Sequence, residues 1–64
     1  MVNIGNSIAK RRKFLKLTQP QLAELAGISL RSLKSIESGE GNPTLTQIMK
    51  ILNILGMKLD IIVR

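Results

Sequence analysis

A chain of 64 residues suffices for a single domain over residues 1–64, and a domain this small buries only about 60% of its unfolded surface. The sequence has neither cysteine nor histidine, which excludes a disulfide framework and the usual zinc sites, so no metal or cofactor is expected. Ten Lys and Arg against four Asp and Glu give a net charge of +6. This charge favours an anionic partner, with nucleic acid as the leading candidate and a membrane surface as the alternative.

Other features of the composition argue against two further classes of protein. No apolar run approaches the length of a membrane-spanning helix and no signal peptide is recognisable, so we expect a cytoplasmic protein that does not bind membranes. The chain also lacks tyrosine, its four carboxylates are scattered, and no glycine-rich phosphate loop follows a strand. An enzyme is therefore not expected.

The first predicted helix begins at a cap, Asn3 or Asn6, and ends near Leu17. Helical spacing places four residues on one face, namely Ile4, Ile8, Arg12 and Leu15. Basic residues occupy much of the remaining surface, namely Lys10, Arg11, Lys13 and Lys16. A run of charges is usually a solvated face, and here we interpret it as partial attraction to phosphates. Phe14, one position off the apolar face, is expected at the edge of the core or in a contact with a partner.

Two short helices joined by a tight turn are predicted between residues 18 and 39. Thr18 and Gln21 form a capping box at the first helix, which Gly27 ends, while Ser29 caps the second helix, which Gly39 ends. The core face of the first helix contains Leu22, Leu25 and Ala26. Two capped helices about three residues apart have the geometry of a helix-turn-helix, whose second helix can lie in the DNA major groove. The alternative is an ordinary corner between helices, which any small helical domain can contain.

The second helix of this pair carries a charge next to its apolar stripe. Leu30, Leu33 and Ile36 form the stripe, and Glu37 lies four residues after Leu33. Arg12 occupies the corresponding position on the first predicted helix. Because unpaired buried charges are costly, we predict a partly buried ion pair between Arg12 and Glu37. The alternative is that both side chains extend to solvent.

A last helix is predicted from a second capping box, Thr44 with Gln47, to about Leu55. Its expected core face consists of Leu45, Ile48, Leu52 and Leu55. Apolar residues continue around the helix at Met49, Ile51 and Ile54. This excess favours a second subunit covering part of the helix, and the alternative is a helix at the centre of the core.

Residues 57–64 alternate apolar and polar side chains, which is typical of a β-strand. A lone strand exposes its backbone groups, so we expect it to pair with its own copy across a two-fold axis, the alternative being a frayed tail. The residues expected in this dimer contact are Ile54, Met57, Leu59, Ile61 and Val63. The predicted fold is all-α: a compact bundle of about four to five short helices over residues 1–55 with a helix-turn-helix, plus a C-terminal strand that pairs across a homodimer.

Three sequence motifs carry a resemblance to a known family. LTQPQLAELAGIS, IESG and NPTL resemble the Cro/cI-type (XRE-like) helix-turn-helix family of phage and bacterial repressors. The resemblance implies binding of double-stranded DNA at a palindromic operator, and it implies the same pairing of Arg12 with Glu37. The GNPTL segment, the helix after it, LG and the terminal strand pattern resemble the HipB-type antitoxin branch. That branch implies repression of its own operon and binding of a HipA-type kinase toxin.

Two alternatives to the antitoxin stay open at this point. One is a stand-alone XRE-like regulator without a toxin partner. The other is a protein-interaction module that neutralises a partner and binds DNA only secondarily.

The resemblance also implies roles for individual residues. Gln19 matches a glutamine that touches a phosphate and can brace the second helix of the motif. The positions that face the groove are Ser29, Leu30, Arg31 and Ser32, followed by Lys34 and Ser35. Arg31 is our candidate for direct reading of guanine, and Leu30 departs from the polar residue that is frequent in the family. Asn42 and Thr44 lie where the next loop and helix start are suited to hold a phosphate.

Overall fold

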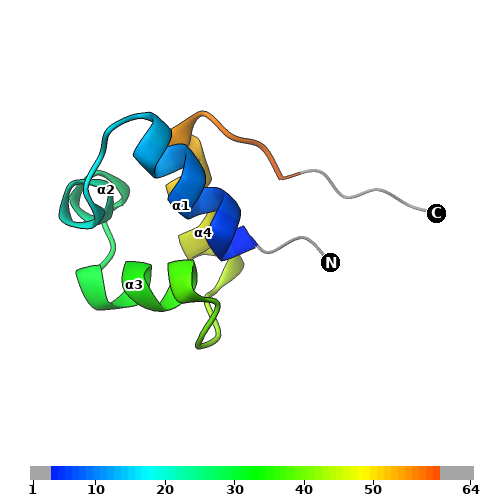
Figure 1. Ribbon diagram of the computed structural model, residues 1–64. Helices are drawn as coiled ribbons and strands as arrows, with labels where there is room; N and C mark the ends of the chain where they lie inside the picture. The colour runs from blue at the N-terminus through cyan, green and yellow to red at the C-terminus, as the bar shows by residue number, and fades with distance from the viewer. Residues whose placement is uncertain (1–3, 60–64) are drawn as a thin grey trace.

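The computed structural model of this chain describes residues 4–59. The part described contains four helices, whose bounds are α1 (Ile4–Phe14), α2 (Gln19–Ala26), α3 (Leu30–Ser38) and α4 (Leu45–Leu55). Figure 1 shows α2 and α3 joined by a tight turn, with α1 and α4 packed beside them. The all-α fold is therefore confirmed over residues 4–59. None of these helices is long and apolar enough to cross a membrane.

Local side-chain chemistry determines where α2, α3 and α4 begin. Thr18 and Thr44 form complete capping boxes with Gln21 and Gln47, and the Ser29 hydroxyl accepts a hydrogen bond from the Ser32 amide. Each of these bonds satisfies a backbone amide that the first turn of a helix would otherwise leave unpaired. The three predicted helix starts are thus confirmed.

The end of α1 differs from the prediction. The helix stops at Phe14 and not near Leu17, and Lys16 follows in the left-handed conformation with φ of 60°. The Leu17 amide then donates a hydrogen bond to the Arg12 carbonyl at 3.0 Å. The chain has to leave the helix here because Thr18 must be extended to cap α2, at φ −81° and ψ 164°.

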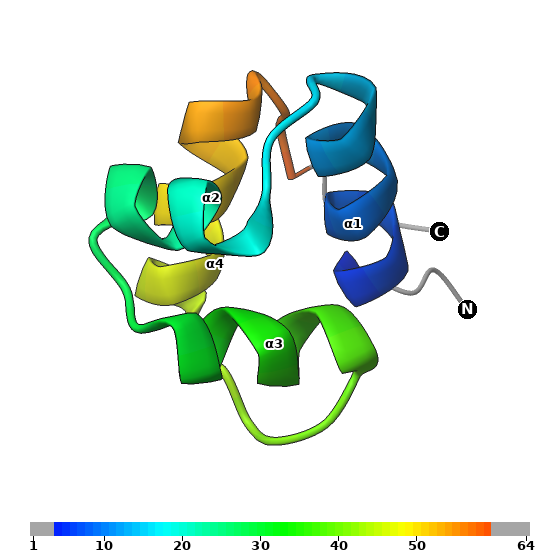
Figure 2. The ribbon, with the colours of Figure 1, turned by 60° about the vertical axis from the view of Figure 1, so that its left-hand side comes forward.

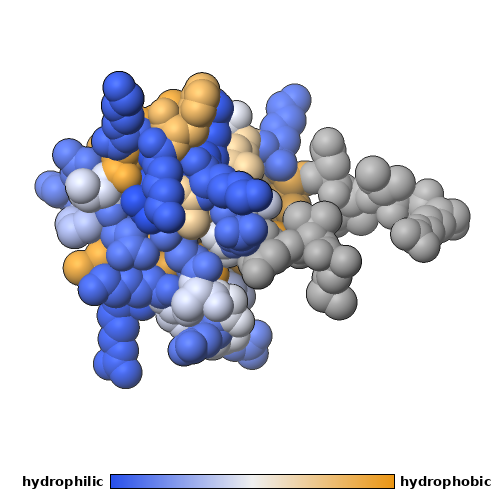
Figure 3. All heavy atoms as spheres, viewed as in Figure 1, coloured by the Kyte–Doolittle hydropathy of each residue, from blue (hydrophilic) through white to orange (hydrophobic). Residues whose placement is uncertain are grey.

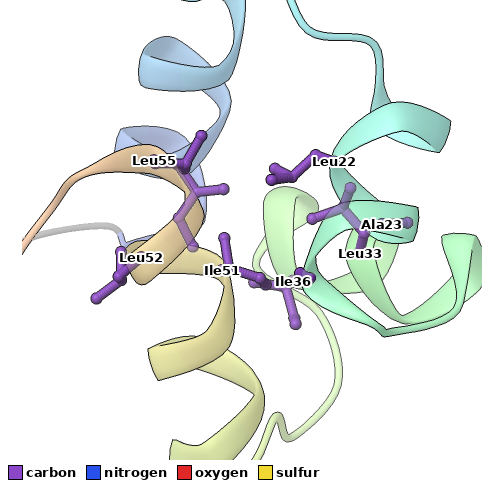
Figure 4. Close-up of a cluster of buried hydrophobic side chains, with 9 residues drawn as sticks. Leu22, Ala23, Leu33, Ile36, Ile51, Leu52 and Leu55 are labelled. Carbon is purple, nitrogen blue, oxygen red and sulfur yellow. The ribbon is translucent and has the colours of Figure 1, made fainter.

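The core lies where α2, α3 and α4 converge beside α1 (Figure 4). Its buried apolar residues are Ile8, Leu22, Ala23, Ala26, Leu33, Ile36, Ile51, Leu52 and Leu55. Residues from all four helices contribute, so no helix buries its apolar face without the others. Hydrophilic residues cover most of the surface seen in Figure 3, with hydrophobic residues in separate patches.

Several predicted core positions lie at the surface. Leu15, Leu25 and Leu45 are 38%, 57% and 63% exposed, while Ala23 and Ile51 occupy the core. The prediction was wrong at these positions because adjacent residues on a helix differ by about 100° in direction, and in helices this short the pattern does not fix the buried face to within one residue. Phe14 is 73% exposed, with the Arg11 guanidinium 5.2 Å from its ring centre.

The C-terminal segment after α4 is described only as far as Leu59. Residues 57–59 form neither helix nor strand; the Met57 amide donates a hydrogen bond to the Leu52 carbonyl at 2.9 Å. The side chains of Ile54 and Met57 pack against the core of the same chain, and Leu59 is 38% exposed. Most of the predicted strand, including Ile61 and Val63, lies outside the described residues, so its pairing stays a prediction.

The start of α1 packs unusually closely against the end of α3. Gly5 is buried inside α1. A β-carbon at this position would overlap the Ile36 carbonyl oxygen and would lie 2.9 Å from the Glu37 carbonyl oxygen. Glycine is therefore required here for the approach of two backbones, and the approach fixes the distance between α1 and α3.

We expect Gly5→Ala to lower the free energy of unfolding by about 1–3 kcal/mol, the usual range for overpacking. The sign is informative because alanine in a helix normally gains up to about 1 kcal/mol over glycine. Urea unfolding measures the change, with Ser7→Ala on the same helix as the control. A more stable Gly5→Ala variant would show that α1 and α3 do not approach this closely.

Candidate nucleic-acid interface

Helix α3 lies along one edge of the molecule, with the other three helices on its inner side (Figure 2). Leu33 and Ile36 are buried on that inner side, 0% and 6% exposed. Arg31 and Lys34 are exposed, and neither has a hydrogen-bond or ion-pair partner within residues 4–59. The outer side of α3 thus presents two free cationic side chains within its first two turns.

The turn between α2 and α3 is short and well bonded. Gly27 adopts the left-handed conformation with φ of 70°, and the Ile28 amide donates a hydrogen bond to the Ala23 carbonyl at 3.0 Å. Ser29 then caps α3, so only three residues separate the two helices. This turn has the length that a helix-turn-helix requires.

All four hydroxyl groups expected to contact DNA are already hydrogen-bonded within the chain. The Ser29 hydroxyl accepts from the Ser32 amide at 3.0 Å and lies 2.9 Å from the Ser32 hydroxyl. The Ser35 hydroxyl donates to the Glu40 carbonyl at 3.0 Å, and the Thr44 hydroxyl accepts from the Gln47 amide. These four residues shape the start of α3, the loop after it and the start of α4.

A shallow hollow separates α3 from the loop that follows it. Its lining residues are Arg31, Ser32, Ser35, Ile36, Asn42, Pro43 and Gln47. Four of the nine residues expected to bind DNA therefore line one depression, and Asn42 among them is exposed. Leu30 is half-buried at the start of α3, beside Arg31.

An ion pair joins α1 to the C-terminal half of α3. Arg12 Nε donates to Glu37 Oε2 at 2.8 Å and Arg12 Nη2 donates to Glu37 Oε1 at 2.9 Å. The two side chains are 10% and 6% exposed, so the pair that the sequence suggested is bidentate and almost buried. Arg12 Nη1 also donates to the Leu17 carbonyl at 2.9 Å, which ties the turn after α1 to the same guanidinium.

Gln19 adds α2 to this network. Its side-chain amide donates to Glu37 Oε1 at 3.1 Å. One carboxylate on α3 is thus bonded to α1 through Arg12 and to α2 through Gln19. A half-buried Gln19 at the start of α2 can brace α3, as the resemblance implied; its contact with a phosphate is a separate prediction.

The charge state of Arg12 follows from this geometry. Hydrogen bonds to the Glu37 carboxylate raise the pKa of Arg12, and they outweigh the burial that lowers it. A raised pKa means that the contribution of Arg12 to stability is complete below its unfolded pKa and is lost only at strongly alkaline pH. The cation is therefore permanent under working conditions.

Arg11 has a structural role that the sequence analysis missed. Its Nε donates to the carbonyl of Leu55, the last residue of α4, at 3.0 Å. This bond satisfies one of the carbonyls that a helix C-terminus leaves unpaired. Arg11 was grouped with the cations that attract phosphate, and sequence spacing gives no signal for a contact between residues 44 positions apart.

Removing one partner of the ion pair leaves the other charge buried and unpaired. We expect Glu37→Ala to lower the free energy of unfolding by about 3 kcal/mol or more. Glu24→Ala, at an exposed carboxylate of α2, is the control and should change it by at most about 0.5 kcal/mol. A double-mutant cycle with Arg12→Met isolates the coupling. Equal effects of Glu37→Ala and Glu24→Ala would contradict a stabilising pair.

Comparison with known proteins also identifies a helix-turn-helix in this chain. The helix-turn-helix family HTH_3 matches residues 8–62. The transcriptional repressor RstR of the cryptic phage CTXphi from Vibrio cholerae serotype O1 is 42% identical over 59 residues, which cover 92% of this chain and 53% of RstR. The immunity repressor protein of Bacillus phage phi105 is 39% identical over 62 residues, covering 97% of this chain and 43% of that protein.

A third relative is matched over more of its own length. It is the HTH-type transcriptional regulator y4mF of Sinorhizobium fredii, 32% identical over 60 residues, which cover 94% of this chain and 79% of y4mF. The chain spans about half the length of the two phage repressors, at 53% and 43%. The match to the family covers the helix-turn-helix and the helices that hold it. The chain therefore belongs to the XRE-type helix-turn-helix family HTH_3.

Proposed function

We propose that this domain is the DNA-binding part of a sequence-specific transcriptional repressor that binds a roughly palindromic operator as a homodimer. The observation that carries the proposal is the contrast between the two sides of α3. On its inner side Glu37 is fixed by Arg12 and Gln19, while on its outer side Arg31 and Lys34 are free. A rigidly held helix with free cations on its outer side is suited to the major groove.

Charge supports duplex DNA as the ligand. The net charge is +6 per chain, so a dimer carries 2 × (+6) = +12. Neutralising phosphates releases bound counterions, and we expect the logarithm of the binding constant to fall with the logarithm of salt concentration by about 0.9 per phosphate contacted. In a dimer the two α3 helices would enter successive major grooves about 34 Å apart.

We expect the side chains on and beside α3 to contact different parts of the DNA. Arg31, in the first turn, can bond bidentately to O6 and N7 of guanine, and the neighbouring Leu30 can contact a thymine methyl group. Lys34 and the exposed Asn42 are suited to phosphates on either side of the groove. The serines act indirectly, because their hydroxyls hold the ends of α3 in place.

The names of the relatives agree with repression, since two are repressors and one is a transcriptional regulator. Neither an antitoxin role nor a HipA-type kinase partner gains support from these names. The features that suggested the antitoxin branch were GNPTL, the helix after it, LG and the alternating pattern of residues 57–64, and most of that last segment lies outside the described residues. The antitoxin role stays a prediction.

The reading role of Arg31 can be tested by selecting bound sequences from a pool of random duplexes. We expect the wild-type chain to enrich one palindromic motif. Arg31→Ala should lose about 1–3 kcal/mol on that motif and accept other bases at the position it reads. Gln19→Ala should weaken selected and random duplexes alike. Equal losses on both kinds of duplex for Arg31→Ala would contradict direct reading.

The dimer can be tested by shortening the chain after Met57, whose amide and side chain belong to the monomer fold. Removal of residues 58–64 should give a folded monomer that binds half-sites poorly, because the two reading helices are no longer linked. Sedimentation measures the mass and circular dichroism the helical content. A dimer of unchanged affinity would exclude these residues from the interface.

A further inference from the structure

All four helices end with the same backbone motif, and one of them ends with a different kind of residue. A left-handed residue follows each helix, directly after α2, α3 and α4 and two positions after the end of α1, and its amide bonds back into the last turn. The left-handed residues are Gly27, Gly39 and Gly56 after α2, α3 and α4, with φ between 68° and 80°, and Lys16 after α1, with φ of 60°. An L side chain is strained in this conformation, whereas glycine adopts it freely.

The folding of α1 does not account for a lysine at this position. A cation near a helix C-terminus is favourable, but the last turn of α1 already contains Arg11, Arg12 and Lys13. The Lys16 side chain is exposed and has no hydrogen-bond or ion-pair partner within residues 4–59. Glycine would therefore end α1 with less strain, and the charge of Lys16 makes no hydrogen bond or ion pair inside the described part of the chain.

The backbone around Lys16 is fixed to the network that holds α3. The Lys16 amide donates to the Lys13 carbonyl at 2.9 Å, and the next residue, Leu17, gives its carbonyl to Arg12. Gln19, three residues after Lys16, is bonded to Glu37 on α3. In Figure 2 the chain runs from the end of α1 directly to the start of α2, which lies beside α3. The backbone of Lys16 is therefore held in place next to the hydrogen-bond network of Arg12, Gln19 and Glu37.

We propose that Lys16 is a phosphate-contacting residue that binds the DNA backbone beside the start of α2, and that its left-handed conformation is tolerated for this contact. The proposal rests on the proposed function only in requiring duplex DNA at the outer side of α3. Lys16 would neutralise one phosphate in each subunit without regard to sequence. It would add affinity and leave base preference unchanged.

The test uses Lys16→Gly in the full chain, with Lys16→Asn as a second neutral residue that tolerates the left-handed conformation. Lys50→Gln, at an exposed lysine of α4, is the control for loss of one charge. Binding to a random-sequence duplex is measured by fluorescence anisotropy over a fourfold range of salt. Thermal unfolding is measured on the same samples without DNA.

We expect both Lys16 variants to bind more weakly, with a log–log salt slope smaller by about 0.9 for each Lys16 that contacts a phosphate. Over the fourfold range, wild-type affinity should therefore fall about 3.5-fold further than that of the variants if one Lys16 contacts a phosphate, and about twelvefold further if the Lys16 of each subunit in a dimer does. Lys16→Gly should also unfold at a higher temperature than wild type, so stability and DNA affinity change in opposite directions. Lys50→Gln should leave the salt slope unchanged.

Wild-type slopes in Lys16→Gly and Lys16→Asn would overturn the proposal, and so would an equal reduction in Lys50→Gln. These outcomes are separable from failure of the proposed function. If the wild-type chain enriches a motif while Lys16→Gly keeps its salt slope, the repressor stands and the phosphate contact fails. If no motif is enriched but the slope falls only in the Lys16 variants, the phosphate contact stands and sequence-specific repression fails.

Discussion

The structure depends on one nearly buried carboxylate, that of Glu37. It accepts two hydrogen bonds from Arg12 on α1 and one from Gln19 on α2, so three helices meet at a single group. A domain this small buries a limited apolar core, and Leu33 and Ile36 supply the apolar part of the attachment of α3. The directional bonds of the ion pair add to the orientation that burial of Leu33 and Ile36 already gives the helix.

The backbone contact at Gly5 works together with this pair. It lets α1 approach the C-terminal carbonyls of α3, and at that distance the Arg12 guanidinium can reach both oxygens of Glu37. These contacts that hold α3 in place are therefore at its C-terminal end, whereas the outward-facing Arg31 and Lys34 lie in its first two turns. Arg31 and Lys34 need no contacts of their own to the rest of the domain.

Sequence reasoning succeeded where the signal is local or pairs opposite charges. The caps at Thr18, Ser29 and Thr44, and the pairing of Arg12 with Glu37, all follow from residue type and spacing. Sequence reasoning failed where a residue's role depends on its contacts with distant parts of the chain. A buried Gly5 has no side chain to reveal a close approach, and the bond from Arg11 to the end of α4 joins distant parts of the chain. At the candidate site, the sequence did not distinguish free side chains from hydroxyls already bonded within the chain.

The difference on α3 between hydrogen-bonded hydroxyls and free cationic side chains affects how the sequence of such a domain can change in evolution. The hydroxyls of Ser29, Ser32 and Ser35 are committed to the ends of the helix, so changing them disturbs the scaffold. Arg31 and Lys34 form no hydrogen bond or ion pair within residues 4–59, so polar contacts of the fold do not constrain their identity. On the proposal that Arg31 reads a base, a lineage carrying this scaffold can change its target sequence by substitution at that one surface position, while the selection that preserves folding acts on a separate set of residues.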